Sequence, residues 1–360
     1  MHKPPAATLW IDERPFELEF GAVLPRLEIA YETWGRLSAA RDNAILICPA
    51  FSSHAHAQSS PRDPSPGWWE GMIGPGCAFD TERFFVVCAS LLGGSFGTTG
   101  PTSIDPRTGE AYRGHFPAVS IRDIVDVHLR LVDHLGIERL FAAAGGSMGA
   151  METLELAIRH PSRVARVIAI SGTDFTRPYT AAIRHLGRRA IMLDPAYQGG
   201  FYDGAGPTEG LRLAREIGTL YYRGREEFNA RFPHQPINPP SREGITFDVQ
   251  SYLDHQGRKA VGLFDANSYL TLSLAMDLHD VWRGFSSREA ALEPVTAAFQ
   301  IVAVEEDRLI GVDEQRAVHR ALVGAGKRSD WHLISSRIGH DAFLVELDRV
   351  TELVRPFLLG

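Results

Sequence analysis

The sequence predicts an α/β fold, a mostly parallel, doubly wound sheet interrupted by a long helical insertion. Short, continuously apolar runs alternate with segments that carry apolar residues at helical spacing, as in a parallel sheet covered on both faces. This alternation stops near residue 173 and resumes after residue 292. We therefore expect a core formed by residues 1–172 and 293–360, with a helical lid insertion at residues 173–292.

Each element follows from the local pattern. The apolar runs predicted as interior strands are 44–48, 84–88, 140–144, 164–170 and 298–304. Helical spacing predicts helices at 121–135, capped by Ser120, and at 150–159, 181–193, 210–221 and 314–323. Residues 18–33 have the pattern of antiparallel strands and are expected at the edge of the sheet, and residues 233–245 are polar and rich in proline.

The most informative segment is 145–149, Gly-Gly-Ser-Met-Gly, between a predicted strand and a predicted helix. A serine between glycines at such a turn is typical of a nucleophile elbow. We expect a strained backbone at Ser147, and side chains at Gly145 or Gly149 would collide with the neighbouring strand or helix. The Met148 N–H would then lie at the positive end of the helix, aimed at an oxyanion. The alternative is a purely structural turn with a capping serine.

A nucleophilic serine needs a base, and the base needs an acid that orients it. After a nucleophile elbow the chain order is serine, acid, histidine. Asp307 lies in a turn after the run 298–304, and His340 follows the strand-like segment 331–335. Both positions are at the carboxyl ends of predicted strands, where sites in open α/β sheets assemble. Nearby alternatives to Asp307 are Glu305, Glu306 and Asp313.

A second oxyanion donor is expected in the loop 49–56, and we predict the backbone N–H of Phe51. His54 and His56 in this loop form an H-x-H pair, but no further ligand follows at metal-site spacing, so no metal is expected. The three cysteines also lack metal-site spacing, and Cys48 and Cys88 are predicted to be buried thiols.

Charge and composition exclude several classes of protein. The 360 residues include 37 basic and 44 acidic side chains, a net charge of −7 without long runs of one sign. This argues against binding to nucleic acid or to an anionic membrane through bulk charge. The first residues lack the apolar segment of a signal peptide, and no stretch has the length of a membrane span. The low, odd cysteine count fits a reducing compartment, so we expect a cytoplasmic location.

Motifs of one family occur in order along nearly the whole chain, from about residue 18 to residue 358. They lie at residues 30–35, 41–46, 67–76, 97–101, 145–149, 222–223, 231–232 and 339–344. Together they resemble the homoserine O-acetyltransferase family, acyltransferases with the α/β-hydrolase fold that act on homoserine or serine.

The resemblance implies a ping-pong reaction in which Ser147 attacks the thioester of an acyl-CoA, with His340 as the base and Asp307 orienting it. It further implies that Arg223 holds the substrate carboxylate and that Asp341 takes the substrate ammonium. Acetyl-CoA or succinyl-CoA would be a co-substrate, with no permanently bound cofactor. The partners would be small-molecule substrates and a second copy of the chain, in a homodimer formed through lid helices.

Residues 50–53 read Ala-Phe-Ser-Ser, which matches neither the Ala-Leu-Thr-Gly usual in homoserine acetyltransferases nor the Gly-Leu-Ser-Pro of serine succinyltransferases. Acceptor and acyl donor therefore stay open, with acetyl transfer to homoserine as the leading hypothesis. The alternative is a carboxylic-ester hydrolase on the same scaffold, because water in place of an alcohol can resolve an acyl-enzyme. A non-catalytic binding protein would lack a member of the triad, and none is missing.

Overall fold

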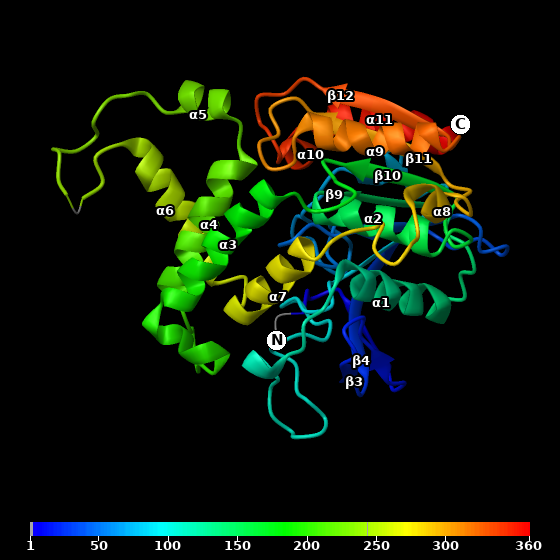
Figure 1. Cartoon of the computed structure of the whole chain (residues 1–360), viewed down its shortest axis with the longest axis horizontal. Helices are drawn as coiled ribbons and strands as arrows, with labels where there is room; N and C mark the ends of the chain where they lie inside the picture. Colours follow the sequence, from blue (N-terminus) through cyan, green and yellow to red (C-terminus); the bar gives the residue numbers. More distant parts are fainter. Residues whose placement is uncertain (1–2, 243) are drawn as a thin grey trace.

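The computed structural model describes residues 3–242 and 244–360, and within them the core is an eight-stranded sheet (Figure 1). In spatial order its strands are β1 (Thr8–Asp12), β4 (Leu27–Trp34), β8 (Phe85–Ala89), β5 (Ala44–Cys48), β9 (Ala142–Gly146), β10 (Arg166–Ile170), β11 (Ala298–Val304) and β12 (Ser329–Ile334). From β8 to β12 all neighbours pair in parallel, whereas β4 is antiparallel to both β1 and β8. The mostly parallel sheet confirms the predicted fold class.

The sheet is buried on both faces, as the continuous apolar runs predicted. In β5, Leu46 belongs to a core cluster that includes helices α1 (Ile121–His134), α2 (Met148–Arg159) and α9 (Val312–Gly324). The alternate residues Ile45 and Ile47 belong to a second cluster that includes helix α11 (Leu347–Leu359). Because side chains alternate along a strand, both halves of the apolar run find a core.

The predicted cap of α1 is confirmed. Ser120 accepts a hydrogen bond from the Asp123 N–H, and the Asp123 carboxylate accepts one from the Ser120 N–H at 2.8 Å, which together form a capping box.

The antiparallel edge differs from its predicted bounds. Strand β4 begins within the predicted segment, ends one residue beyond it and is antiparallel, but Leu18 lies outside any strand. Strands β2 (Phe16–Glu17) and β3 (Val23–Leu24) pair with each other in a separate small sheet. Besides β8, β4 pairs with β1, which lies N-terminal to the predicted segment. Leu9 and Ile11 of β1 are each 42% exposed, so this edge strand lacks the buried apolar pattern that marks the others.

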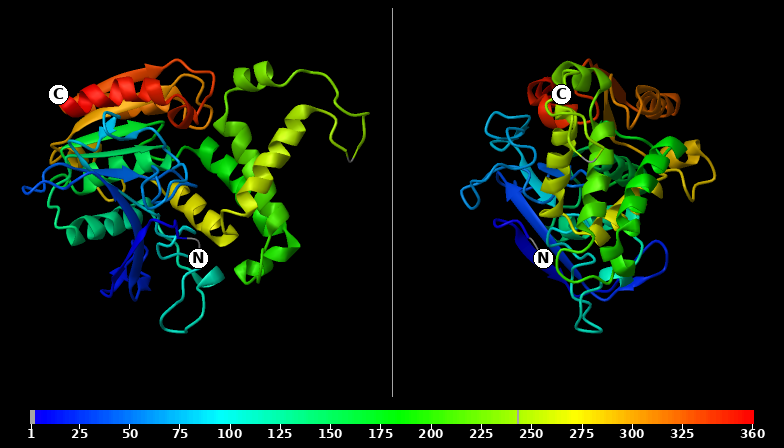
Figure 2. Two further views of the ribbon diagram at one scale, coloured as in Figure 1. Left: turned by 180° about the vertical axis from the view of Figure 1, so that it is seen from behind. Right: turned by 90° about the vertical axis from the view of Figure 1, so that its left-hand side faces the viewer.

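Between β10 and β11, the regular elements within the described residues are helices. They are α3 (Pro178–Leu193), η2 (Pro195–Gly200), α4 (Thr208–Tyr222), α5 (Arg225–Arg231), α6 (Asp248–Val261), α7 (Ala266–Asp277) and α8 (Arg288–Leu292). Figures 1 and 2 show α3, α4 and α6 packed together to one side of the sheet, beyond the carboxyl ends of the parallel strands, where the elbow lies. We refer to residues 173–292 as the lid.

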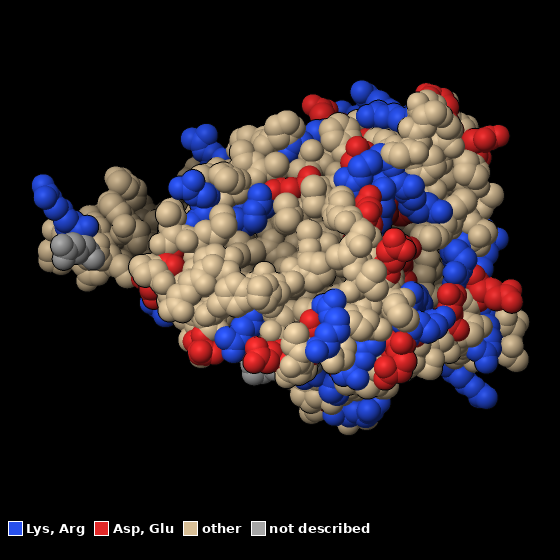
Figure 3. All heavy atoms as spheres, turned by 60° about the horizontal axis from the view of Figure 1, so that its bottom comes forward, with Lys and Arg blue, Asp and Glu red and all other residues tan. Residues whose placement is uncertain are grey.

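Short elements complete the described fold. They are β6 (Ile73–Gly74), β7 (Phe79–Asp80), η1 (Arg113–His115) and α10 (Ala342–Val345). On the face shown in Figure 3, acidic and basic side chains are interspersed around an uncharged area. None of the helices in residues 3–242 and 244–360 combines the length and the apolar character that crossing a membrane requires.

Candidate active site

The nucleophile elbow has the geometry that its sequence predicts. Ser147 joins β9 to α2 with φ 58° and ψ −118°, a conformation that costs a non-glycine residue free energy. A Cβ atom on Gly149 would lie 2.1 Å from the carbonyl oxygen of Cys48, and one on Gly145 would lie 2.5 Å from the backbone of Gly149. Strand and helix can approach this closely only because both positions are glycine.

The three residues expected to form a triad meet at one end of the sheet. The Nε2 atom of His340 lies 2.7 Å from Ser147 Oγ, and its Nδ1 atom lies 2.8 Å from Asp307 Oδ2. With the proton on Nδ1, the imidazole donates to the carboxylate and can accept the serine proton. His340 and Asp307 are 2% and 6% exposed, so the chain of hydrogen bonds is shielded from water.

Backbone contacts distinguish Asp307 from its acidic neighbours. Its second oxygen, Oδ1, accepts hydrogen bonds from the N–H groups of Leu309 and Ile310, both at 2.9 Å. These bonds fix the carboxylate in the turn after β11. Glu305, a sequence alternative, instead accepts a hydrogen bond from Ser335 at 2.8 Å. The structure therefore brings Asp307, and not Glu305, to the imidazole.

The electrostatics of His340 follow from its partners. Burial on its own would lower the pKa of this imidazole, but the charge and hydrogen bond of Asp307, together with the charge of Asp341, raise it above the ordinary value. The site therefore stabilises the imidazolium that forms when the histidine accepts a proton.

Two backbone N–H groups near Ser147 are candidates for an oxyanion hole. Phe51 lies in the loop after β5, and Met148 is the first residue of α2. In the part of the chain that the structure describes, neither N–H donates a hydrogen bond to a protein acceptor. Free donors beside a nucleophile, one of them at a helix N-terminus, suit a developing negative charge.

Ser147 and His340 open onto a pocket with about 850 Å³ of empty space, including its open mouth. One wall is formed by core loops and the other by lid helices. The lid residues on its wall include Ile183, Arg184, Ala214, Arg215, Ile217, Gly218, Tyr222, Tyr269, Ser273 and Met276. The cavity onto which the serine opens is therefore enclosed by both parts of the chain.

Two cations of this pocket were missed by the sequence reasoning. Arg184 is 8% exposed and is paired with Asp277 at 2.6 Å. Arg215 lines the pocket over the ring of Tyr222, and among the described residues it has no carboxylate within ion-pair distance. The predicted helix 181–193 contains basic but no acidic side chains, which could have indicated an ion-pair partner elsewhere. An unpaired guanidinium in a pocket suits an anionic substrate group.

Arg223 and Asp341, the two residues expected to bind the charged groups of the substrate, form an ion pair with each other. Arg223 follows α4, and its Nε atom lies 3.3 Å from Asp341 Oδ2. Asp341 also lines the pocket beside His340. Burial raises the pKa of the Asp341 carboxyl, while the charges of Arg223 and His340 oppose this shift. A substrate ammonium that approaches Asp341 would therefore share its carboxylate with Arg223.

A second cavity, with about 770 Å³ of empty space, adjoins the first beneath the lid. The two share Phe51, Ser52, Arg215 and Tyr269 in their walls. The far wall comes from α6 and the segment after it, and it includes the exposed ammonium of Lys259. The Phe51 ring packs against Phe264 and Tyr269, so it separates the two spaces.

The H-x-H pair in the loop after β5 serves other contacts. His56 is buried, with Nδ1 at 3.0 Å from Glu32 and Nε2 at 2.9 Å from the carbonyl oxygen of Ser65. His54 packs against Phe96, and burial, together with the charge of His56, lowers its pKa to about 4. The two rings thus anchor the loop that carries Phe51.

Comparison with known proteins identifies the group to which this chain is similar. A family model described as the alpha/beta hydrolase fold matches residues 43–265. The chain is 43% identical to a homoserine O-acetyltransferase of Moorella thermoacetica, over 95% of this chain and 92% of that protein. It is 44% identical to a serine O-succinyltransferase of Litchfieldella anticariensis, over 96% of each.

A solved structure has the same fold over almost its whole length. It is that of esterase E22, with a TM-score of 0.90 and 28% identity, covering 98% of this chain and 100% of that one. Proteins similar to this chain are therefore named both as transferases and as an esterase. By its sequence similarity and its fold, this chain is an enzyme that belongs to the homoserine O-acetyltransferase family of α/β-hydrolase-fold proteins.

Proposed function

We propose that this enzyme transfers an acyl group from an acyl-CoA to the hydroxyl of L-homoserine or L-serine, with acetyl-CoA and L-homoserine as the leading pair. The observation that carries the proposal is the hydrogen-bonded series Ser147–His340–Asp307 opening onto a pocket with charged walls. The named activities of the two relatives support the acceptor and the donor classes.

In the first half-reaction, Ser147 Oγ attacks the thioester carbonyl carbon while His340 Nε2 takes the serine proton. The N–H groups of Phe51 and Met148 stabilise the oxyanion of the tetrahedral intermediate. When this intermediate collapses, the carbon–sulfur bond breaks, and His340 returns the proton to the leaving thiolate. The products of this step are an acyl-serine and free CoA.

In the second half-reaction, the amino-acid hydroxyl attacks the acyl-serine, and His340 again takes the proton. Collapse of the second intermediate releases the O-acyl amino acid and restores Ser147. Asp341 and Arg223 would bind the charged α-amino and α-carboxylate groups, and Arg215 is a further cation available to a carboxylate. Binding these groups would align the hydroxyl and disfavour attack by water.

The test of this function is CoA release with acetyl-CoA or succinyl-CoA as donor and L-homoserine or L-serine as acceptor. We expect at least one pair to exceed the rate without acceptor by about 100-fold, the scale that acceptor positioning can supply. Release of CoA at the background rate with all four pairs would reject the proposal.

Hydrolysis of carboxylic esters is a second candidate, which the likeness to esterase E22 supports. It uses the same acyl-serine, resolved by water. Comparing hydrolysis of p-nitrophenyl acetate with acyl transfer in one preparation separates the two. A hydrolase would turn over the ester at a rate that added homoserine or serine leaves unchanged.

The cytoplasmic location and the homodimer stay predictions.

The enzyme should lose activity in acid because His340 becomes protonated. Protonated imidazole cannot accept the serine proton, and the raised pKa of His340 means that protonation begins at a higher pH than for an ordinary histidine. We expect the acidic limb of the kcat/KM profile to have its midpoint above about pH 6.5. A midpoint well below this value would contradict the electrostatic account.

Lys259 provides a test of where the acyl donor binds. Its exposed ammonium lines the second cavity, where it can meet a CoA phosphate. We expect Lys259→Ala to raise KM for the acyl-CoA about three- to fivefold, or about 0.7–1 kcal/mol, with KM for p-nitrophenyl acetate unchanged. The matched control is Arg258→Ala, which removes a neighbouring cation that pairs with Asp254 at 3.7 Å. Equal effects of the two substitutions would place the donor elsewhere.

A further inference from the structure

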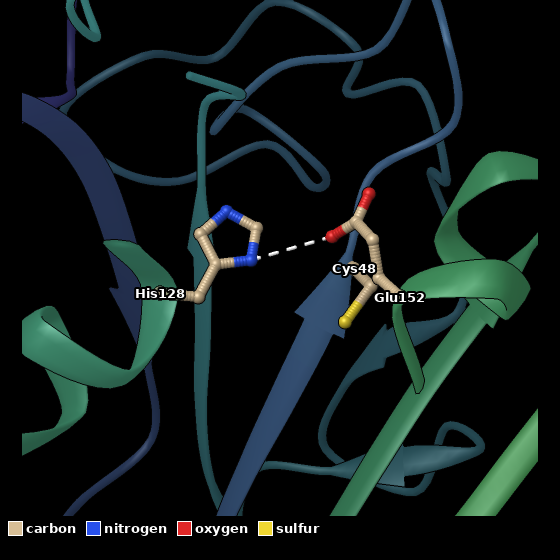
Figure 4. A group of neighbouring side chains, drawn as sticks. All are labelled: Cys48, His128 and Glu152. Carbon is tan, nitrogen blue, oxygen red and sulfur yellow. Dashed lines mark ion pairs between the residues drawn. The ribbon is translucent and has the colours of Figure 1, made fainter. Parts of the chain in front are cut away.

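Three potential metal ligands from separate elements meet inside the core. Cys48 is the last residue of β5, His128 belongs to α1 and Glu152 belongs to α2 (Figure 4). Their exposed fractions are 1%, 1% and 0%. One ligand atom from each, the Cys48 sulfur, a His128 ring nitrogen and a Glu152 carboxylate oxygen, lies within 4.8 Å of the other two.

The polar atoms of this cluster lack hydrogen-bond partners. Neither ring nitrogen of His128 and neither carboxylate oxygen of Glu152 forms a hydrogen bond within residues 3–242 and 244–360. His128 Nδ1 lies 3.3 Å from Glu152 Oε2, which is ion-pair distance, but the geometry is not that of a hydrogen bond. This ion pair leaves His128 Nε2 and Glu152 Oε1 with neither a hydrogen bond nor an ion pair among the described residues. Buried polar groups are almost always partnered, so these two atoms favour a ligand from outside the protein.

We propose that Cys48, His128 and Glu152 bind one Zn²⁺ ion. A thiolate, an imidazole nitrogen and a carboxylate oxygen are the ligand types of zinc, and the thiolate disfavours Mg²⁺ and Ca²⁺. On binding, the Cys48 thiol and the Glu152 carboxyl release the protons they hold to solvent, and the sulfur and a carboxylate oxygen form bonds to the metal. The dication with one thiolate and one carboxylate is then neutral, which suits a site buried from bulk solvent. The fourth position would take a water molecule.

The metal would have a structural role, because its ligands lie on elements that support the elbow. Cys48 directly precedes the loop that carries Phe51, and its carbonyl oxygen is the atom that a side chain at Gly149 would meet. Glu152 lies on the first turns of the helix that begins after Ser147. A bound ion would therefore join the end of β5 to α1 and α2, the elements that support the elbow.

Protons compete with the metal for these ligands. Burial raises the pKa of the Cys48 thiol well above its usual range, and it also raises the pKa of Glu152.

The test uses the full-length enzyme produced in minimal medium with Zn²⁺ or with Co²⁺, so that the closed site can fill during folding. After chelator treatment and desalting, we expect about one equivalent of metal per chain by mass spectrometry. The cobalt form should show thiolate-to-metal charge-transfer absorption. Cys48→Ala should remove this band and most of the metal, whereas Cys88→Ala, which changes another buried cysteine outside the cluster, should retain both.

A second variant keeps the test decisive if Cys48→Ala fails to fold. Glu152→Gln preserves shape and removes one anionic ligand, and circular dichroism reports whether it is folded. Metal-free but folded wild-type enzyme from both media would overturn the proposal. Cobalt retained without a charge-transfer band would also overturn it, because the metal would then be bound without the thiolate. Neither readout depends on acyl transfer, so the proposed function can fail separately.

Discussion

Replacing Ser147 with alanine is expected to lower kcat for acyl transfer by about 10⁴–10⁶-fold, because residual catalysis would come only from binding and the oxyanion donors. The reaction proposed for this site passes through a covalent acyl-serine, and alanine cannot form it. Rapid mixing of the wild type with the acyl-CoA should also give a burst of CoA and a mass increase of one acyl group on the peptide that contains Ser147. The variant should show neither.

Ser171→Ala is the matched control for this substitution. Like Ser147, Ser171 is a serine with positive φ that follows a strand of the sheet, here the neighbouring strand β10, but it is fully buried. Its hydroxyl has no hydrogen-bond partner among the described residues, so its loss should change kcat by less than about threefold. Retention of transfer activity by Ser147→Ala would show that the nucleophile is misassigned.

Replacing Asp307 with asparagine is expected to lower kcat by about 10³–10⁴-fold while the fold is retained. The asparagine can keep the hydrogen bonds from Leu309 and Ile310 through its carbonyl oxygen. Its amide nitrogen would then face His340 Nδ1 and donate to it, which places the proton on Nε2. In that tautomer the imidazole cannot accept the proton of Ser147. The measurement is kcat with saturating donor and acceptor.

The pH profile of Asp307→Asn gives a second readout. Asp307 is a main cause of the raised pKa of His340, so the remaining activity should have its acidic limb at lower pH than the wild type. Glu305→Gln is the control, because Glu305 contacts Ser335 and not the imidazole. An equal loss of activity in both variants would point to a general disturbance of the turn after β11.

Much of the core could be predicted from the sequence because burial on two faces leaves a strong pattern. The run 298–304 matches β11 at both ends, and the helix after Ser120 begins at the predicted residue. Strand β1 was not predicted, because its apolar residues are partly exposed at the edge of the sheet and leave no buried pattern. The triad residues could be placed because each follows a strand, and parallel strands bring their carboxyl ends to one edge.

The rest of the site depends on contacts that local sequence does not encode. Arg215 lines the pocket because α4 packs against α3 and α6 with the Arg215 side toward the pocket. The pairing of Arg223 with Asp341 joins the end of a lid helix to the loop after β12. The cluster of Cys48, His128 and Glu152 comes from three elements far apart in the chain, so it has no spacing motif.

The two walls of the pocket are subject to different constraints. The triad and the proposed oxyanion donors lie in loops and at a helix start fixed by the sheet, where small changes collide with backbone. The opposite wall consists of side chains from α3, α4 and α7, none of which contributes a strand or a triad member. Substitutions in those helices can therefore change which substrate the pocket accepts, while the residues that carry out the reaction stay the same. An ancestral scaffold of this kind could give rise to descendants with different acceptors through a handful of substitutions.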